Sequence, residues 1–267
     1  MNREIFEKLY EKYNRRRFVH PDPLEFLYHY SDPADREIVG LISSSLAYGR
    51  VKQILKSVSW VLRRMPSPSE YVQGASVNSL RRTFGEFKHR FTTGEELVRL
   101  LYGVGRAVER YGSLHNCFLS GFSENDETIL PALSNFTDEL TGAANPRFNS
   151  LLPSPRRGSA CKRLNLFLRW MARRDDVDPG GWDSIPRSKL IIPLDTHIHK
   201  ISLAVKLTGR RQADMRTAVE ITNAFQTISP EDPVRYDFAL TRLGIRDDVE
   251  VEPFLQKCGM CKAAKNA

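Results

Sequence analysis

Residues 193–201 read Pro-Leu-Asp-Thr-His-Ile-His-Lys-Ile, and residues 153–162 read Pro-Ser-Pro-Arg-Arg-Gly-Ser-Ala-Cys-Lys. Each stretch runs from a loop into a segment whose apolar residues recur at helical spacing. The upstream helix therefore carries Lys162 near its start, and the downstream helix begins at or beside Asp195. This amine and this carboxylate, each at the start of a helix, are the candidate reactive groups of the chain.

Helical periodicity extends over most of the sequence, and no segment alternates apolar and polar residues convincingly for more than four positions. The pattern predicts two helices within residues 35–62, broken near Tyr48, and a long helix over 95–111 that Gly112 ends. Further helices are expected over 125–140, from Ser159 as a cap to about Arg173, from Asp195 or Thr196 to Gly209, from Asp214 onwards, and over 234–243 before Gly244. The sequence therefore predicts an all-α fold.

A connector rich in proline and glycine, residues 141–159, divides the helices into two groups. We expect residues 1–267 to form one unit of two helical lobes. Residues 30–150 lie mainly in the first lobe, and residues 151–245 form a second lobe that holds both quoted stretches. Residues 246–267 are expected to be a C-terminal tail.

The composition is that of a globular, basic protein. Of the 267 residues 41% are apolar, and 40 Lys and Arg against 32 Asp and Glu give a net charge of +8. This charge favours a polyanionic partner, because bound phosphates release counterions, although a generally basic surface is the alternative. No apolar run approaches the roughly 20 residues of a membrane helix, and the four cysteines do not suit a secreted disulfide scaffold. We therefore expect a cytoplasmic, nucleoid-associated protein without membrane contact.

The two quoted stretches resemble the helix-hairpin-helix DNA glycosylase superfamily, the group that includes endonuclease III. The resemblance rests on Asp195 followed by Thr-His and a helix, and on residues 155–162 as a variant of the family's hairpin. Lys162 lies 33 positions before Asp195, with Phe167 and Met171 between them, which is similar to the archaeal 8-oxoguanine glycosylase branch. The usual Leu-Pro-Gly-x-Gly hairpin and the iron–sulfur cysteines are missing. As a whole, the chain looks like a mainly bacterial family of unknown function.

The resemblance implies that Asp195 is the catalytic carboxylate and that Lys162 is the nucleophile of a bifunctional enzyme. Cleavage of an N-glycosidic bond builds positive charge on the deoxyribose, which a carboxylate held at a helix N-terminus can stabilise. A nucleophilic lysine must be neutral, through burial or through cations such as Arg163 and Arg169. The alternatives are that Asp195 is only a helix cap and that Lys162 is a solvated surface residue.

Residues 156–159 form a basic loop before a predicted helix start, where backbone N–H groups can hold a phosphate and arginines add charge-assisted contacts. A flexible basic linker is the alternative. The predicted DNA-binding residues are Arg156, Arg157, Gly158, Ser159, Arg163 and His197. The candidates for stacking on an extruded base are Tyr48, Trp170 and Tyr236, although aromatic residues of helical proteins are more often core.

Two other patterns carry less weight. The sequence Gly103-Val104-Gly105 looks like a glycosylase hairpin, yet it lies inside a helical apolar pattern, so we expect a helix with packing glycines. Cys258 and Cys261 have the spacing of a metal or redox pair, but a lone pair in a charged tail is a weak signal. We therefore expect no metal site and no cofactor.

Together with the resemblance, these residues predict a DNA-repair glycosylase with associated AP-lyase activity. It would act as a monomer on double-stranded DNA with a flipped lesion base, and oxidised guanine is the first substrate that the resemblance suggests. Two other classes stay open. One is a non-catalytic module that binds bent or damaged DNA with the same fold, and the other is an enzyme acting on a small substrate.

Overall fold

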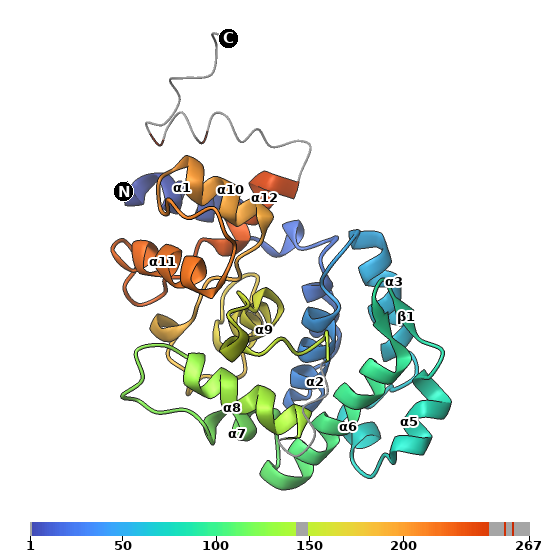
Figure 1. Ribbon diagram of the computed structural model, residues 1–267. Coiled ribbons are helices and arrows are strands. Elements are labelled where there is room, and N and C mark those ends of the chain that lie inside the picture. The colour runs from blue at the N-terminus through green and yellow to red at the C-terminus, as the bar shows by residue number, and fades with distance from the viewer. Residues whose placement is uncertain (1, 143–148, 246–253, 255–257, 259–267) are drawn as a thin grey trace.

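The computed structural model describes residues 2–142, 149–245, 254 and 258, and it is built of helices with one short hairpin (Figure 1). The helices of eight or more residues are α1 (Arg3–Tyr13), α2 (Pro33–Ser45), α3 (Val51–Leu62), α5 (Val77–Phe84), α6 (Gly94–Tyr111), α8 (Leu130–Thr141), α9 (Lys162–Ala172), α10 (Thr196–Ala204), α11 (Met215–Gln226) and α12 (Asp237–Ile245). The shorter α-helices are α4 (Pro68–Val72) and α7 (Leu114–Leu119), and the 3-10 helices are η1 (Arg16–Phe18), η2 (Pro23–His29), η3 (Pro155–Arg157) and η4 (Arg187–Lys189). The strands β1 (Lys88–His89) and β2 (Thr92–Thr93) pair antiparallel.

The all-α prediction is confirmed for the described residues, and several helix boundaries have clear local causes. Asp32 caps α2 and is followed by Pro33, Thr93 and Glu96 form a capping box at the start of α6, and Gly112 ends α6 in a left-handed conformation. The predicted break near Tyr48 separates α2 from α3. None of the described helices is both long and apolar enough to cross a bilayer.

Other predicted boundaries are wrong by several residues. Helix α8 begins at Leu130 rather than at residue 125, and α10 ends at Ala204, before Gly209. The fourth helix of the C-terminal group begins at Asp237 rather than at Val234. Helix α9 begins at Lys162, because Cys161 directly before it has a left-handed backbone conformation, and Ser159 lies outside the helix in an isolated β-bridge with Asp214.

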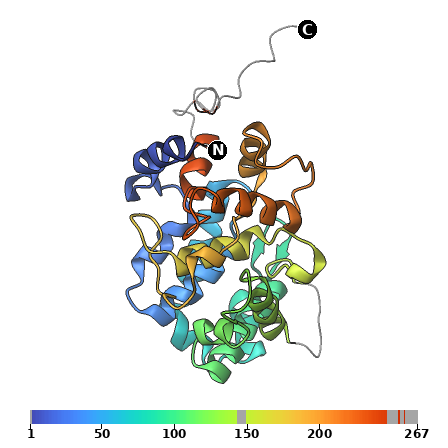
Figure 2. The same cartoon turned by 90° about the vertical axis from the view of Figure 1, so that its left-hand side faces the viewer.

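Helix α9 lies at the centre of the molecule, and it packs against α2 (Figure 1). Its buried stripe is the predicted one, and its members are Leu164, Phe167, Leu168 and Met171. The two ends of the described chain meet, since α1 packs against α12; the view in Figure 2 shows them at the same end of the molecule. The centrality of α9 places its first residue, Lys162, next to segments from distant parts of the sequence.

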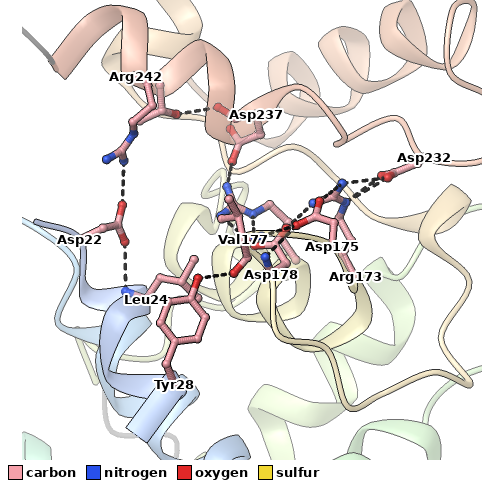
Figure 3. Close-up of polar contacts among 12 residues, drawn as sticks. Asp22, Leu24, Tyr28, Arg173, Asp175, Val177, Asp178, Asp232, Asp237 and Arg242 are labelled. Atoms are coloured by element: carbon pink, nitrogen blue, oxygen red, sulfur yellow. Dashed lines mark hydrogen bonds and ion pairs between the residues drawn. The ribbon is translucent and has the colours of Figure 1, made fainter. Parts of the chain in front are cut away.

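Arg169 of α9 and Arg173, the residue directly after this helix, are buried in the core together with their counter-ions. Figure 3 labels Arg173 with Asp178 and Asp232. Arg169 pairs with Asp178 and with Asp237, and Arg173 pairs with Asp178 and Asp232. Removing one member of such a buried group costs roughly 3–5 kcal/mol, because it leaves a charge without a partner. The network therefore fixes α9 to the start of α12.

The two glycines inside α6 are packing glycines, as predicted. A Cβ atom at Gly103 would lie 2.0 Å from the backbone oxygen of Leu140 in α8, and one at Gly105 would lie 2.6 Å from the backbone oxygen of Val72 in α4. Neither backbone can move without shifting a whole helix. These positions require glycine for close helix approach, and they form no hairpin.

We expect Gly103→Ala to lower the free energy of unfolding by about 2–3 kcal/mol, because overpacking outweighs the roughly 1 kcal/mol that alanine gains in a helix. Gly209→Ala is the matched control, since nothing lies within 4 Å of a Cβ atom there. That variant should stay within about 0.5 kcal/mol of the parent. Denaturant unfolding of the three proteins measures the difference, and equal stability would contradict the close approach of α6 and α8.

Candidate active site

The structure brings Lys162 and Asp195 together. Lys162 is the first residue of α9 and Asp195 is the N-cap of α10, and Nζ of Lys162 lies 3.3 Å from Oδ2 of Asp195. Their side chains are 36% and 14% exposed. Both residues line a cavity of about 770 Å³, which can hold a ligand of the size of a nucleotide base.

The two carboxylate oxygens of Asp195 have different partners. Oδ1 accepts hydrogen bonds from the backbone N–H groups of His197 at 2.9 Å and Ile198 at 2.8 Å, as expected of a helix cap. Oδ2 faces the amine of Lys162. Asp195 therefore caps α10 with Oδ1, while Oδ2 can act on the amine of Lys162.

Residue Cys161, directly before Lys162, has a left-handed backbone conformation with φ of 45°. This conformation costs a non-glycine residue about 1–2 kcal/mol. The surrounding contacts maintain it, since the Cys161 thiol donates to the backbone oxygen of Pro153 at 3.3 Å. Burial raises the pKa of this thiol to about 11, so it remains a donor at neutral pH. The turn sets the direction in which α9, and with it Lys162, begins.

Arg163, which was predicted to contact DNA, is half-buried and lines the cavity, and its guanidinium is held by the protein itself. Its guanidinium donates to the backbone oxygens of Ser45, at 2.8 Å, and Ser150, and it lies 4.9 Å from the ring of Tyr48. Burial lowers its pKa. Arg163 joins α9 to the end of α2 and to the segment before the basic loop. Arg169 likewise does not present an unpaired positive charge to Lys162, because Asp178 and Asp237 pair with it.

The basic loop is exposed and anchored. Residues 156–159 lie at the surface, and the backbone N–H of Met215 donates to the oxygen of Gly158 at 3.2 Å. Arg156 lies 3.3 Å from the carboxylate of Asp138. Because the loop is fixed to the start of α11, it is not a free linker. Gly158 and Ser159 line the cavity, but α9 begins three residues later, so they are not its first turn.

Of the two histidines after Asp195, His197 lines the cavity, while His199 forms a hydrogen bond with the backbone oxygen of Arg210 at 2.9 Å. The two side chains therefore point in different directions, as the helical spacing predicts. Within the described ranges, no group of three or more His, Cys, Asp or Glu residues could hold a metal ion. Cys258 is half-buried, and Cys261 lies outside the described residues.

Of the predicted stacking residues, only Tyr48 lines the cavity. Trp170 and Tyr236 are fully buried, so the stacking prediction is wrong for both. Tyr236 instead donates from its hydroxyl to Glu7 at 2.8 Å, as part of the packing of α1 on the C-terminal helices. Their spacing in the sequence could not separate a core position from a cavity wall.

An exposed aromatic residue next to Tyr48 was not predicted from the sequence. Phe91, in the turn between β1 and β2, is 76% exposed, and its ring stacks on that of Tyr48 with centroids 6.4 Å apart and an interplanar angle of 10°. The Tyr48 hydroxyl donates to the backbone oxygen of His89 at 2.8 Å, which ties the hairpin to the cavity rim. Two-residue strands are too short to leave a periodic signal.

Charged residues from α12 and from the segment before α2 also line the cavity, and they were not predicted as site residues. Arg242 pairs with Asp22 at 2.8 Å (Figure 3). Asp237 pairs with Arg169, and all four residues line the cavity. Burial raises the pKa of Asp237 to about 6, with a further contribution from the charge of Asp195 and an opposing one from Arg169. Asp237 therefore lies within electrostatic reach of Asp195.

Residues 22–246 match the family described as Protein of unknown function (DUF2400). The matched range contains Lys162, Asp195 and the helices α2 to α12. Neither the curated proteins nor the solved structures gave a match. Since the match covers most of the chain, the protein belongs to the DUF2400 family.

Proposed function

We propose that the protein is a DNA glycosylase with AP-lyase activity, in which Lys162 attacks the deoxyribose and Asp195 activates the amine. The observation that carries this proposal is the distance of 3.3 Å between Nζ of Lys162 and Oδ2 of Asp195 in the wall of a cavity of about 770 Å³. A carboxylate in contact with an amine can take its proton, which leaves the free electron pair that a nucleophile needs.

The chemistry would run in two stages. The Lys162 amine bonds to C1′ of the deoxyribose while the bond from C1′ to the base breaks, and the base leaves with the electron pair and takes up a proton. The sugar ring then opens to a Schiff base with Lys162. Loss of a proton from C2′ expels the 3′ phosphate by β-elimination. Asp195 stabilises the positive charge that develops on the sugar.

We further propose the two-lobed arrangement of helix-hairpin-helix glycosylases, with double-stranded DNA lying across the cavity. The lining of the cavity is consistent with it, since Tyr48, Val51 and Ile54 come from residues 30–150, and Lys162 and Asp195 come from residues 151–245. The exposed basic loop of residues 156–159 would hold the phosphates beside the flipped nucleotide. This would place the protein on the nucleoid.

Borohydride trapping tests the proposal on a panel of duplexes, each with one lesion base, and on a duplex with one abasic site. Oxidised guanine is the first lesion to include. The expected result is a covalent protein–DNA complex with the abasic duplex and with at least one lesion. Tight, salt-dependent binding without any covalent complex would identify a non-catalytic DNA-binding module. Absence of both would favour an enzyme acting on a small substrate.

We expect the double variant Arg156→Ala and Arg157→Ala to weaken binding to duplexes of any sequence and to lower the salt slope by roughly one to two units, because phosphate contacts carry no sequence information. Arg63→Ala with Arg64→Ala is the matched control, since it removes the same charge from an exposed site at the end of α3. Binding titrations over a range of salt concentrations measure the slope. If both double variants change it equally, the loop has no special contact with DNA.

A further inference from the structure

Three consecutive arginines lie at the surface, shortly before the chain enters the cavity wall. Arg15 directly precedes η1, which begins with Arg16 and Arg17, and all three residues are exposed. Arg15 forms an ion pair with Asp176 at 2.7 Å. Within the part of the chain that the structure describes, the other two arginines contact aromatic rings and pair with no carboxylate. Two positive charges therefore remain for an anionic partner.

Aromatic rings hold both of these guanidinium groups. The guanidinium carbon of Arg16 lies 3.6 Å from the centre of the Tyr28 ring, and that of Arg17 lies 4.9 Å from the centre of the Phe18 ring. Tyr28 is itself fixed, because its hydroxyl donates to the backbone oxygen of Val177 (Figure 3). At 3.6 Å a guanidinium lies nearly flat on the ring, so the N–H groups at its edge can bind a phosphate in bidentate fashion. Less side-chain entropy is then lost on binding.

The arginines adjoin the cavity of the candidate active site. The backbone oxygen of Phe18, which follows them, accepts from Arg242 at 3.2 Å, and Arg242 also pairs with Asp22. Both Asp22 and Arg242 line the cavity, so η1 is anchored next to its rim. The basic loop of residues 156–159 reaches the same cavity through Gly158 and Ser159. Two basic surfaces from distant parts of the sequence therefore border one cavity.

We propose that Arg16 and Arg17 form a second phosphate-binding surface, and that a DNA duplex held by the basic loop extends across the cavity to reach it. A duplex carries phosphates at regular intervals, so one ligand can contact two separate basic surfaces, whatever its sequence. The inference rests on the part of the proposed function that places duplex DNA across the cavity. It does not depend on the chemistry of Lys162.

The double variant Arg16→Ala with Arg17→Ala tests the surface by binding alone. Its affinity for a long abasic duplex should fall about tenfold, and the salt slope should fall by roughly one to two units, because about two phosphate contacts are lost. Titrations over a range of salt concentrations measure both quantities, and thermal melting shows whether the fold is kept. Unchanged affinity and slope would overturn the proposal.

Arg63→Ala with Arg64→Ala is again the matched control. The Arg64 guanidinium carbon lies 3.5 Å from the centre of the Trp60 ring, so this variant also loses two exposed positive charges and one close ring contact. Residues 55–64 do not line the cavity. The affinity of the control for the long duplex should stay within about threefold of the wild type. Equal losses in the two double variants would reflect net charge alone and would overturn the proposal.

Shortened duplexes locate the contact. Two series of abasic duplexes are cut back stepwise, one on each side of the abasic site. The affinities of the wild type and of Arg16→Ala with Arg17→Ala should converge in one series, once the remaining base pairs no longer reach the arginines. In the other series the difference should persist. A difference that is independent of length in both series would overturn the proposal, because it would show no contact at a defined place on the duplex.

Borohydride trapping separates this surface from the proposed chemistry. At saturating protein, Arg16→Ala with Arg17→Ala should trap the same fraction of an abasic duplex as the wild type, but about tenfold more protein should be needed to reach it. A lower trapped fraction at saturation would overturn the assignment as a binding surface. If the wild type traps nothing while the binding tests give the expected results, the chemistry of Lys162 is rejected and the phosphate-binding surface stands.

Discussion

Lys162→Gln is expected to abolish the covalent complex that borohydride traps on abasic DNA, with a loss of at least about a thousandfold. Glutamine keeps the polarity and much of the length of lysine but has no nucleophilic amine, so no Schiff base can form. The fold should be preserved, because the pair with Asp195 is partly exposed and such pairs contribute about 1 kcal/mol or less. Gel analysis of trapped complexes and thermal melting measure the two effects.

Lys200→Gln is the control for adventitious trapping. Lys200 lies on α10 close to Asp195 in sequence, but it is exposed and does not line the cavity. Its substitution should leave the trapped fraction unchanged. A Lys162→Gln protein that still forms the complex at the wild-type level would show that another amine is the nucleophile.

The helices were largely predictable from the sequence, because local periodicity and capping residues act within a few positions. The spacing of Leu164, Phe167, Leu168 and Met171 gives the buried face of α9, and Asp195 and Asp214 act as caps. The juxtaposition of Lys162 with Asp195 could be inferred only through the resemblance. The local sequence pattern of each helix does not predict that the first residues of the two helices lie next to each other.

The remaining parts of the site depend on partners that are distant in the sequence. Arg169 and Asp237 are 68 positions apart, and neither residue signals by itself that it is buried with the other. The same applies to Arg163, whose basic character suggested a phosphate contact although its guanidinium is held by backbone oxygens from two other segments. Charge is a poor guide to exposure where counter-ions converge, because a paired charge can be buried.

Asp195→Asn separates the capping and catalytic roles, because the structure assigns them to different oxygens. Asparagine can keep its amide oxygen on the N–H groups of His197 and Ile198, so the cap survives, and asparagine ranks with aspartate as a cap. The amide NH₂ then faces Lys162, where it can neither take a proton nor stabilise positive charge on the sugar. Base excision should fall by roughly a hundredfold or more, on the order of 3 kcal/mol, while DNA binding changes little or tightens.

The control for this last substitution is Asp32→Asn at the cap of α2. Asp32 accepts from two backbone N–H groups through one oxygen, as Asp195 does, but it lies outside the cavity. Both variants should melt within about 4 °C of the parent, since a change of about 1 kcal/mol shifts the midpoint of a protein of this size by that amount. Only Asp195→Asn should lose excision. An Asp195→Asn protein that excises bases at the parental rate would show that the carboxylate beside Lys162 is a helix cap and nothing more.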